Sequence, residues 1–129
     1  MPIDTDVVVV HDGARPLATP KLFAAVVDAV VAGADAAVPG LAVADTVKRI
    51  DRGEVVETLP RDGLVVIQTP QAFRAEVLRG AHLHDADATD DAALVERMGA
   101  TVRVVPGDPR NVKVTTVADL EVAQALAGP

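Results

Sequence analysis

The stretch that decides the fold is Val7–Pro16, which reads VVVVHDGARP. Four consecutive valines have the branched side chains that suit a strand buried on both faces of a parallel sheet. The strand stops at a His-Asp pair and an Arg, and ligands of open α/β sheets bind beyond the carboxyl ends of the strands. Asp12 and Arg15 are therefore the first candidate site residues. The alternative is that Asp12 only starts a turn and Arg15 is a solvated loop charge, and this segment alone does not separate the two.

The composition of the 129 residues limits the class of protein. Half of the residues are apolar but only 2% are aromatic, so the core must consist of Val, Ala and Leu. The absence of Cys excludes disulfides and thiolate chemistry, and three scattered His make a poor metal site. A net charge of −7 disfavours binding to nucleic acid. No apolar run approaches the roughly 18 residues that cross a membrane, so we expect a cytoplasmic protein with neither nucleic acid nor membrane as partner.

Strand and helix signals alternate along most of the chain. Strands are predicted at about residues 7–10, 35–39, 64–67 and 101–105. Helices are predicted to open at capping threonines and to run over about 19–33, 69–80, 89–99 and 116–126. This alternation predicts an α/β fold with a parallel sheet and right-handed crossovers. The strand count resembles one half of a doubly wound domain, and neither of the glycine-rich phosphate loops G-x-G-x-x-G and G-x-x-x-x-G-K-[ST] occurs in residues 1–129.

The region that follows the second predicted strand changes character. Val43–Ile50 and Val55–Leu59 alternate apolar and polar residues around Asp51–Glu54, a pattern typical of a two-stranded hairpin. Both faces are too polar for the main core, and an isolated hairpin is marginal in water. We therefore predict an arm over about residues 42–62 that packs on the parent domain or on a second subunit. An ordinary edge hairpin is the alternative.

Four polar clusters lie at predicted strand ends or helix starts, namely His11–Pro16, Ile67–Phe73, Ala88–Asp91 and Asn111–Thr115. In this order, with Asp45–Lys48 between the first two, they resemble the 2-C-methyl-D-erythritol 4-phosphate cytidylyltransferase family of the non-mevalonate isoprenoid pathway, from about Val7 to Leu126. The resemblance implies a Rossmann-like nucleotidyltransferase sheet with helices on both faces, here partial, plus a protruding hairpin arm. Residues 1–129 would form the C-terminal portion of one such domain. The implied reaction transfers CMP from CTP to 2-C-methyl-D-erythritol 4-phosphate with Mg²⁺ and releases pyrophosphate.

The resemblance also implies roles for single residues. Asp12 and Arg15 border the substrate, and Asp12 lies near the metal. Lys113 neutralises phosphate charge and is, with Asp12, a candidate catalytic residue. Thr69 and Thr89 line the substrate pocket, although each could equally be a helix cap, and helix N-termini also bind anions.

In the family that the chain resembles, the arm is exchanged between the subunits of a homodimer. Thr46 and Arg61 would then serve the site of the partner subunit. Family members also carry a glycine-rich loop with an Arg and a Lys that hold the CTP triphosphate, and residues 1–129 lack it. We therefore expect this chain to be inactive alone. The alternatives are a non-catalytic dimerising module and a phosphatase with a nucleophilic Asp, whose usual second Asp is Ala14 here.

Overall fold

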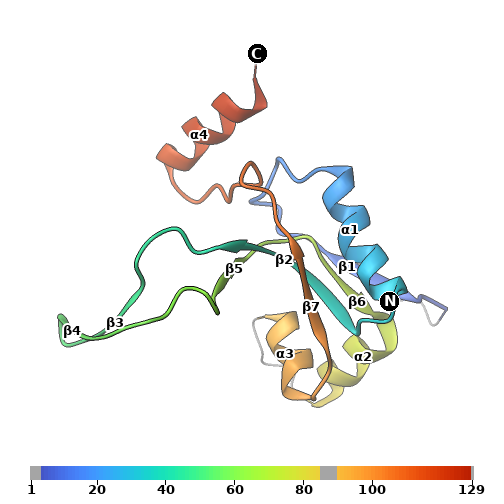
Figure 1. The fold of residues 1–129 in the computed structure, drawn as a ribbon. Coiled ribbons are helices and arrows are strands. Elements are labelled where there is room, and N and C mark those ends of the chain that lie inside the picture. Colours follow the sequence, from blue (N-terminus) through green and yellow to red (C-terminus); the bar gives the residue numbers. More distant parts are fainter. Residues whose placement is uncertain (1–3, 85–89, 129) are drawn as a thin grey trace.

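The computed structural model describes residues 4–84 and 90–128, which form a mixed sheet with helices on its two faces and a separate hairpin (Figure 1). The sheet contains β1 (Val7–Val10), β2 (Ala36–Ala42), β5 (Val65–Ile67), β6 (Gln71–Arg74) and β7 (Val102–Pro106). The helices are α1 (Pro20–Val31), α2 (Ala75–His84), α3 (Asp91–Arg97) and α4 (Val117–Ala127). No helix within the described ranges has the length and apolar character needed to cross a membrane.

The predicted parallel sheet is wrong, because most strand pairs are antiparallel. β6 pairs antiparallel with β1 and β2, β5 pairs antiparallel with β2, and β2 and β7 form the parallel pair. The cause lies at Thr69–Pro70, where a helix was expected. The chain instead continues from β5 into β6 along the same edge of β2, and α2 begins only at Ala75. No helical crossover therefore separates β5 from β6.

The expected helices on both faces of the sheet are confirmed by two core clusters. Neighbouring residues of a strand point to opposite faces. One cluster joins the sheet to α2 and α3 through Ala36, Val38, Phe73, Leu78 and Val95. The other joins the sheet to α1 through Ala37, Ala72, Val26 and Val30. The core is thus built from small and branched aliphatic side chains with one Phe, as the composition predicts.

The predicted burial of β1 is wrong, and β5 is not buried either. Val9 and Val10 are 37% and 36% exposed, because β1 lies at the edge of the described sheet, where its neighbour is β6. All three residues of β5 are exposed. A run of branched apolar residues indicates a strand in either position, so the sequence pattern alone could not place these strands at an edge.

The second strand also extends further than expected. The sequence predicts its end at about residue 39, but Pro39 and Gly40 both lie inside β2, where they pair with Val105 and Pro106 of β7. A Cβ on Gly40 would lie 2.7 Å from Cγ1 of Val104. Gly40 therefore serves close packing within the sheet rather than a turn.

Three of the four helices begin at the expected places. Thr19 caps α1 by accepting from the Leu22 amide, and Thr116 caps α4 in a capping box with Asp119. Asp90 caps α3 by accepting from the Ala92 amide; Thr89, the predicted cap, lies outside the described residues.

Acidification is expected to fray α4. Thr115 and Thr116 donate hydrogen bonds to Asp119 and lower its pKa from 3.8 to about 2. Because the pKa is lower in the folded state, this stabilisation is complete above the unfolded pKa and is lost as the pH falls through about 2. Between about pH 5 and pH 2, the helical Cα chemical shifts of α4 should decline more than those of α1 in the wild-type chain. In an Asp119→Asn variant the two helices should decline together, and an identical decline in the wild-type chain would contradict the prediction.

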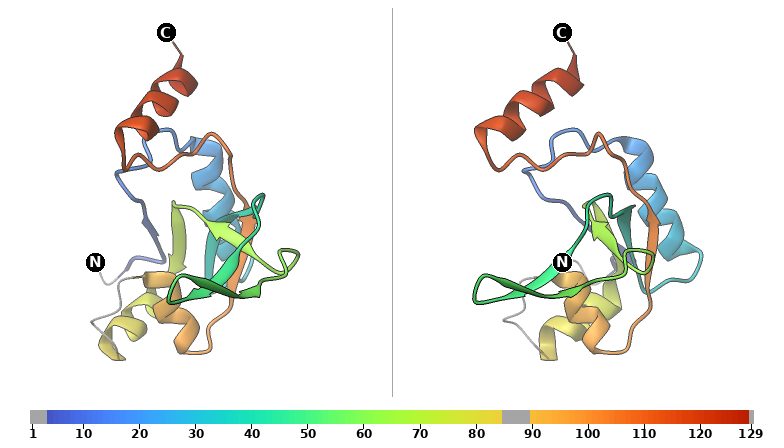
Figure 2. Two further views of the ribbon diagram at one scale, coloured as in Figure 1. Left: turned by 90° about the vertical axis from the view of Figure 1, so that its left-hand side faces the viewer. Right: turned by 60° about the vertical axis from the view of Figure 1, so that its left-hand side comes forward.

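The predicted hairpin is present and projects from the body of the molecule (Figures 1 and 2). It consists of β3 (Lys48–Asp51) and β4 (Glu54–Thr58), which form their own two-stranded antiparallel sheet. Arg52 and Gly53 make the turn with φ values of 51° and 81°. Every residue of both strands is exposed, including the apolar side chains of Ile50, Val55 and Val56.

Candidate functional site

Two loops that are distant in the sequence meet beyond the end of β1. The loop between β7 and α4 passes beside the loop between β1 and α1 (Figure 2). The Val114 amide donates to the Ala14 carbonyl at 2.8 Å, and Nη1 of Arg15 donates to the Asn111 carbonyl at 2.8 Å. These contacts bring the predicted site residues of the two loops together.

Asp12 and Lys113 form an ion pair at this junction. Oδ2 of Asp12 lies 3.4 Å from Nζ of Lys113, and Oδ1 accepts from the Ala14 amide at 2.9 Å. The Ala14 amide, and then Lys113 and Arg15, lower the pKa of Asp12 against an opposing effect of burial. The side chains are 37% and 50% exposed, so both charges are open to a ligand. The junction thus presents an ionised carboxylate beside an ammonium group.

Arg15 adds a second positive charge. Its side chain is partly buried, and burial lowers its pKa against the opposing effect of Asp12. A guanidinium remains protonated in proteins at neutral pH. The hydrogen bond to the Asn111 carbonyl fixes the side chain, so the charge has a defined position next to Asp12.

Thr69 belongs to the same cluster, but it does not cap a helix as predicted. Its Oγ1 accepts from the Asp12 amide at 3.0 Å and lies 3.1 Å from Nδ1 of His11. Nε2 of His11 lies 3.0 Å from the Arg15 carbonyl, which can only accept. Nε2 therefore carries the hydrogen, and in the neutral imidazole the Thr69 hydroxyl donates to Nδ1. His11, which also makes an edge contact with Phe23, was not predicted as a site residue; its place between the strand and Asp12 was the available signal.

Two buried amide side chains hold this cluster together, and sequence reasoning missed both. Gln68 and Asn111 are 6% and 0% exposed. Gln68 pairs with the backbone of Asp108, and Nδ2 of Asn111 donates to the Thr69 carbonyl at 2.8 Å. Both residues belong to the polar clusters noted in the sequence, but their burial depends on contacts between distant segments.

The Gly107→Ala variant is expected to be less stable than the wild-type chain. A Cβ at this position would lie 2.8 Å from Oε1 of Gln68 and 3.1 Å from the backbone oxygen of Gly40, so backbone must shift. Overpacking of this kind costs about 1–3 kcal/mol in the free energy of unfolding, which urea titration measures. Gly63→Ala is the matched control, because nothing lies within 4 Å of its added Cβ. Equal midpoints for the two variants would contradict the prediction.

Two predicted site residues, Thr46 and Arg61, are not part of this cluster. Thr46 is exposed in the segment that leads to β3, and Nη1 of Arg61 donates to the Ala44 carbonyl at the base of the arm. The arm leads away from the central sheet (Figure 1). Thr89 lies outside the described residues. The chain therefore brings together Asp12, Arg15, Thr69 and Lys113. Lys113 lies beside Asp12 because the two loops meet.

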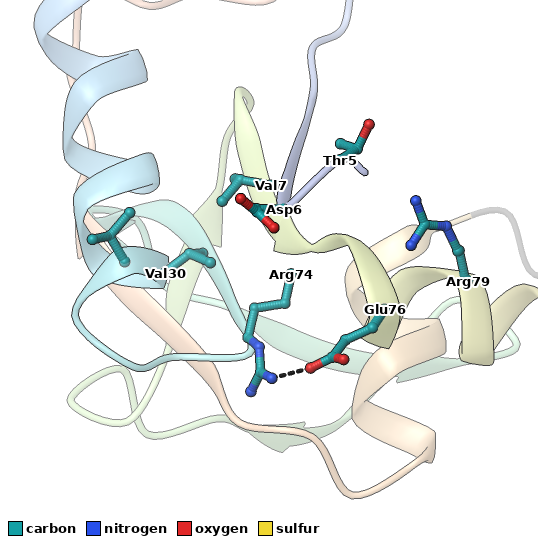
Figure 3. Close-up of a pocket in the computed structure, with 8 residues that line it drawn as sticks. Thr5, Asp6, Val7, Val30, Arg74, Glu76 and Arg79 are labelled. Carbon is teal, nitrogen blue, oxygen red and sulfur yellow. Dashed lines mark hydrogen bonds and ion pairs between the residues drawn. The ribbon is translucent and has the colours of Figure 1, made fainter. Parts of the chain in front are cut away.

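A separate cavity of about 430 Å³ opens at the other end of β1, beside Asp6 and Val7 (Figure 3). Arg74 lines this cavity, but its guanidinium forms ion pairs with Asp35 and Glu76. These two carboxylates offset the charge of Arg74, and Asp6 and Arg79 add one further charge of each sign to the lining. The junction around Asp12 and Lys113 is consequently the better candidate for binding a phosphorylated ligand.

The side chains at the junction that could act as metal ligands limit which ion it could bind. Asp12 contributes one carboxylate, and within residues 4–84 and 90–128 no three His, Cys, Asp or Glu side chains gather into a metal-binding group. A cage built wholly from protein ligands is therefore not present in this part of the chain. One carboxylate does fit Mg²⁺, which usually keeps several waters and is held by one or two carboxylates together with substrate phosphates.

Comparison with known proteins identifies the family that this chain resembles. The family model described as IspD, 2-C-methyl-D-erythritol 4-phosphate cytidylyltransferase, matches residues 1–128. A relative of that name from Frankia casuarinae is 52% identical over 125 residues, which cover 95% of this chain and 47% of the relative. A bifunctional enzyme IspD/IspF from Solidesulfovibrio magneticus is 47% identical, and the match covers 100% of this chain and 33% of that protein.

The fold comparison gives the same answer. The crystal structure of 2-C-methyl-D-erythritol 4-phosphate cytidylyltransferase from Thermus thermophilus matches with a TM-score of 0.85 at 38% identity, covering 95% of this chain and 62% of that one. The chain spans about half the length of the curated relatives named above or less. The match across residues 1–128 and the shared fold lead to one assignment: this chain belongs to the 2-C-methyl-D-erythritol 4-phosphate cytidylyltransferase family.

Proposed function

We propose that this chain forms the part of a cytidylyltransferase that binds 2-C-methyl-D-erythritol 4-phosphate and makes the dimer contact. The complete reaction would join this substrate to CTP and release pyrophosphate. One observation carries the proposal: Lys113 and Asp12, from distant loops, lie 3.4 Å apart beside Arg15 and Thr69. The family membership supplies the identity of the substrates.

The chemistry suits these residues. A phosphate oxygen of the methylerythritol substrate attacks the α-phosphorus of CTP, and the new P–O bond forms as the bond to pyrophosphate breaks. Such a transfer needs no covalent enzyme intermediate, only alignment and neutralisation of charge. Lys113 and Arg15 provide positive charge for phosphate oxygens. Asp12, held ionised, accepts hydrogen bonds from substrate hydroxyl groups.

Asp12 is also the residue that would hold Mg²⁺. When bound, the ion neutralises negative charge on the triphosphate. The carboxylate is partly exposed and its Oδ1 is held by the Ala14 amide, so it could supply one oxygen ligand to a hydrated ion.

The arm is proposed to pack against a second copy of the chain. Ile50 and Val55 are paired across the hairpin and are 64% and 57% exposed. Thr46 and Arg61 would then reach the substrate site of the partner subunit rather than the site of their own chain. A homodimer would thus account for the two predicted site residues that lie away from Asp12.

Two measurements test the proposed function. Calorimetric titration should show that the chain binds 2-C-methyl-D-erythritol 4-phosphate and that Asp12→Asn weakens this binding. Pyrophosphate release from CTP with Mg²⁺ should be absent for residues 1–129 alone, because they contain no glycine-rich triphosphate loop. A chimera in which this chain replaces its aligned segment in the Frankia casuarinae relative should be active. An inactive but folded chimera, together with no binding by the chain, would refute the proposal.

A further inference from the structure

We propose that Asn111 is a positioning residue that keeps Arg15, Thr69 and Lys113 in place around Asp12. Gln68 in turn holds Asn111 and its loop in position. The inference rests on the proposed function for the identity of the ligand. It concerns residues that do not themselves face the ligand, and it assigns them the task of setting the geometry of those that do.

Asn111 connects three of the four clustered site residues. Its side chain donates to the Thr69 carbonyl at 2.8 Å, and its own carbonyl accepts from Nη1 of Arg15 at 2.8 Å. Lys113 follows two residues later in the same loop, and Val114 is hydrogen bonded to Ala14. A displacement of Asn111 would therefore move Lys113 relative to Asp12.

Gln68 fixes the other end of the Asn111 loop. Its side-chain amide donates to the Asp108 carbonyl at 2.9 Å and accepts from the Asp108 amide at 3.1 Å, as a backbone peptide group would. Oε1 also accepts from Nδ2 of Asn111 at 3.3 Å. The absence of a side chain at Gly107 allows this approach. Gln68 directly precedes Thr69, so one strand end carries both the support and a site residue.

Two buried polar atoms of this cluster have no protein partner among the residues that the structure describes. Oδ1 of Asn111 and Nε of Arg15 are buried without a hydrogen-bond partner in the described part of the chain. Buried polar atoms that lack partners cost free energy, and such exceptions in native proteins are expected at functional sites. An apolar residue at position 111 would avoid burying that carbonyl oxygen but would lose the contact with Thr69. This balance favours a positioning role over a purely structural one.

The first test uses ¹⁵N relaxation of the folded chain, so a change in global stability does not enter. In Asn111→Ala, the order parameters of residues 112–114 should fall from about 0.85, typical of rigid backbone, to below about 0.6. Gln124→Ala removes an exposed amide from α4 and should change nothing. If Asn111→Ala does not fold, Gln68→Ala replaces it with the same expectation. Unchanged order parameters in a folded variant would overturn the proposal.

The second test separates positioning from direct binding by a double-mutant cycle. Asn111→Ala and Lys113→Ala should each weaken binding of 2-C-methyl-D-erythritol 4-phosphate by a similar factor, and the double variant should lose little more. Multiplicative losses would show that Asn111 does not act through Lys113 and would overturn the proposal. If the wild-type chain does not bind this compound, the proposed function fails, while the relaxation measurement still decides the role of Asn111.

Discussion

The Lys113→Ala variant is expected to bind 2-C-methyl-D-erythritol 4-phosphate roughly ten- to a hundredfold more weakly than the wild-type chain. A hydrogen bond to a charged group contributes roughly 1.5–3 kcal/mol, and about 1.4 kcal/mol corresponds to a factor of ten in affinity. Lys113 lies 3.4 Å from Asp12 and is half exposed, so its ammonium can reach a phosphate without leaving the junction. Isothermal titration calorimetry measures the loss directly.

The loss should not come from unfolding. Ion pairs between exposed side chains contribute little to the free energy of unfolding, and the pair with Asp12 is of this kind. Lys21→Ala is the matched control, since it removes the same charge from an exposed position on α1. If the Lys21 and Lys113 variants lose affinity equally, the effect is one of net charge, and a specific phosphate contact of Lys113 is contradicted.

The second large effect concerns the arm. The wild-type chain is expected to have the mass of a dimer in light scattering at micromolar concentration, and Ile50→Glu with Val55→Glu should convert it to a monomer. The two side chains are cross-strand partners on an exposed hairpin, and an isolated hairpin of this kind is marginal in water. Burying two carboxylates without partners in an interface would oppose association strongly.

A control variant distinguishes an effect of the arm on dimerisation from the effect of replacing any exposed apolar side chain. Val31, at the end of α1, is 74% exposed, and Val31→Glu should leave the dimer intact. Circular dichroism should confirm that both variants remain folded. A wild-type chain that is monomeric at micromolar concentration would refute the proposed dimer, and so would a dimer that persists in the arm variant.

Local signals predicted some elements of the fold but could not predict how they pair. Thr19-Pro20 and Thr69-Pro70 are the same dipeptide, and each predicts a capped helix. Thr19 does cap α1, whereas the hydroxyl of Thr69 contacts Asp12 and His11, and a strand follows. The difference arises from tertiary contacts, which also made β5 and β6 adjacent and most of the sheet antiparallel.

The residues of the candidate site were also predictable only where local sequence signals identify them. Asp12 and Lys113 follow from their place in polar clusters and from the family resemblance, and the structure brings them together. The predicted role of Thr46 and Arg61 requires a second copy of the chain, because both residues belong to the arm region away from Asp12. Gln68 and Asn111 escaped prediction because buried amides are recognised by their partners, which here lie some 40 residues apart in the sequence.

The most direct test of the central claim, that this junction binds a phosphorylated substrate, is a comparison of two ligands. The affinities of 2-C-methyl-D-erythritol 4-phosphate and of the same polyol without phosphate should be measured by calorimetry for the wild-type chain and for Lys113→Ala. The account predicts that the wild-type chain prefers the phosphate ester by at least about tenfold and that the variant loses most of this preference. An equal preference in both proteins would contradict it.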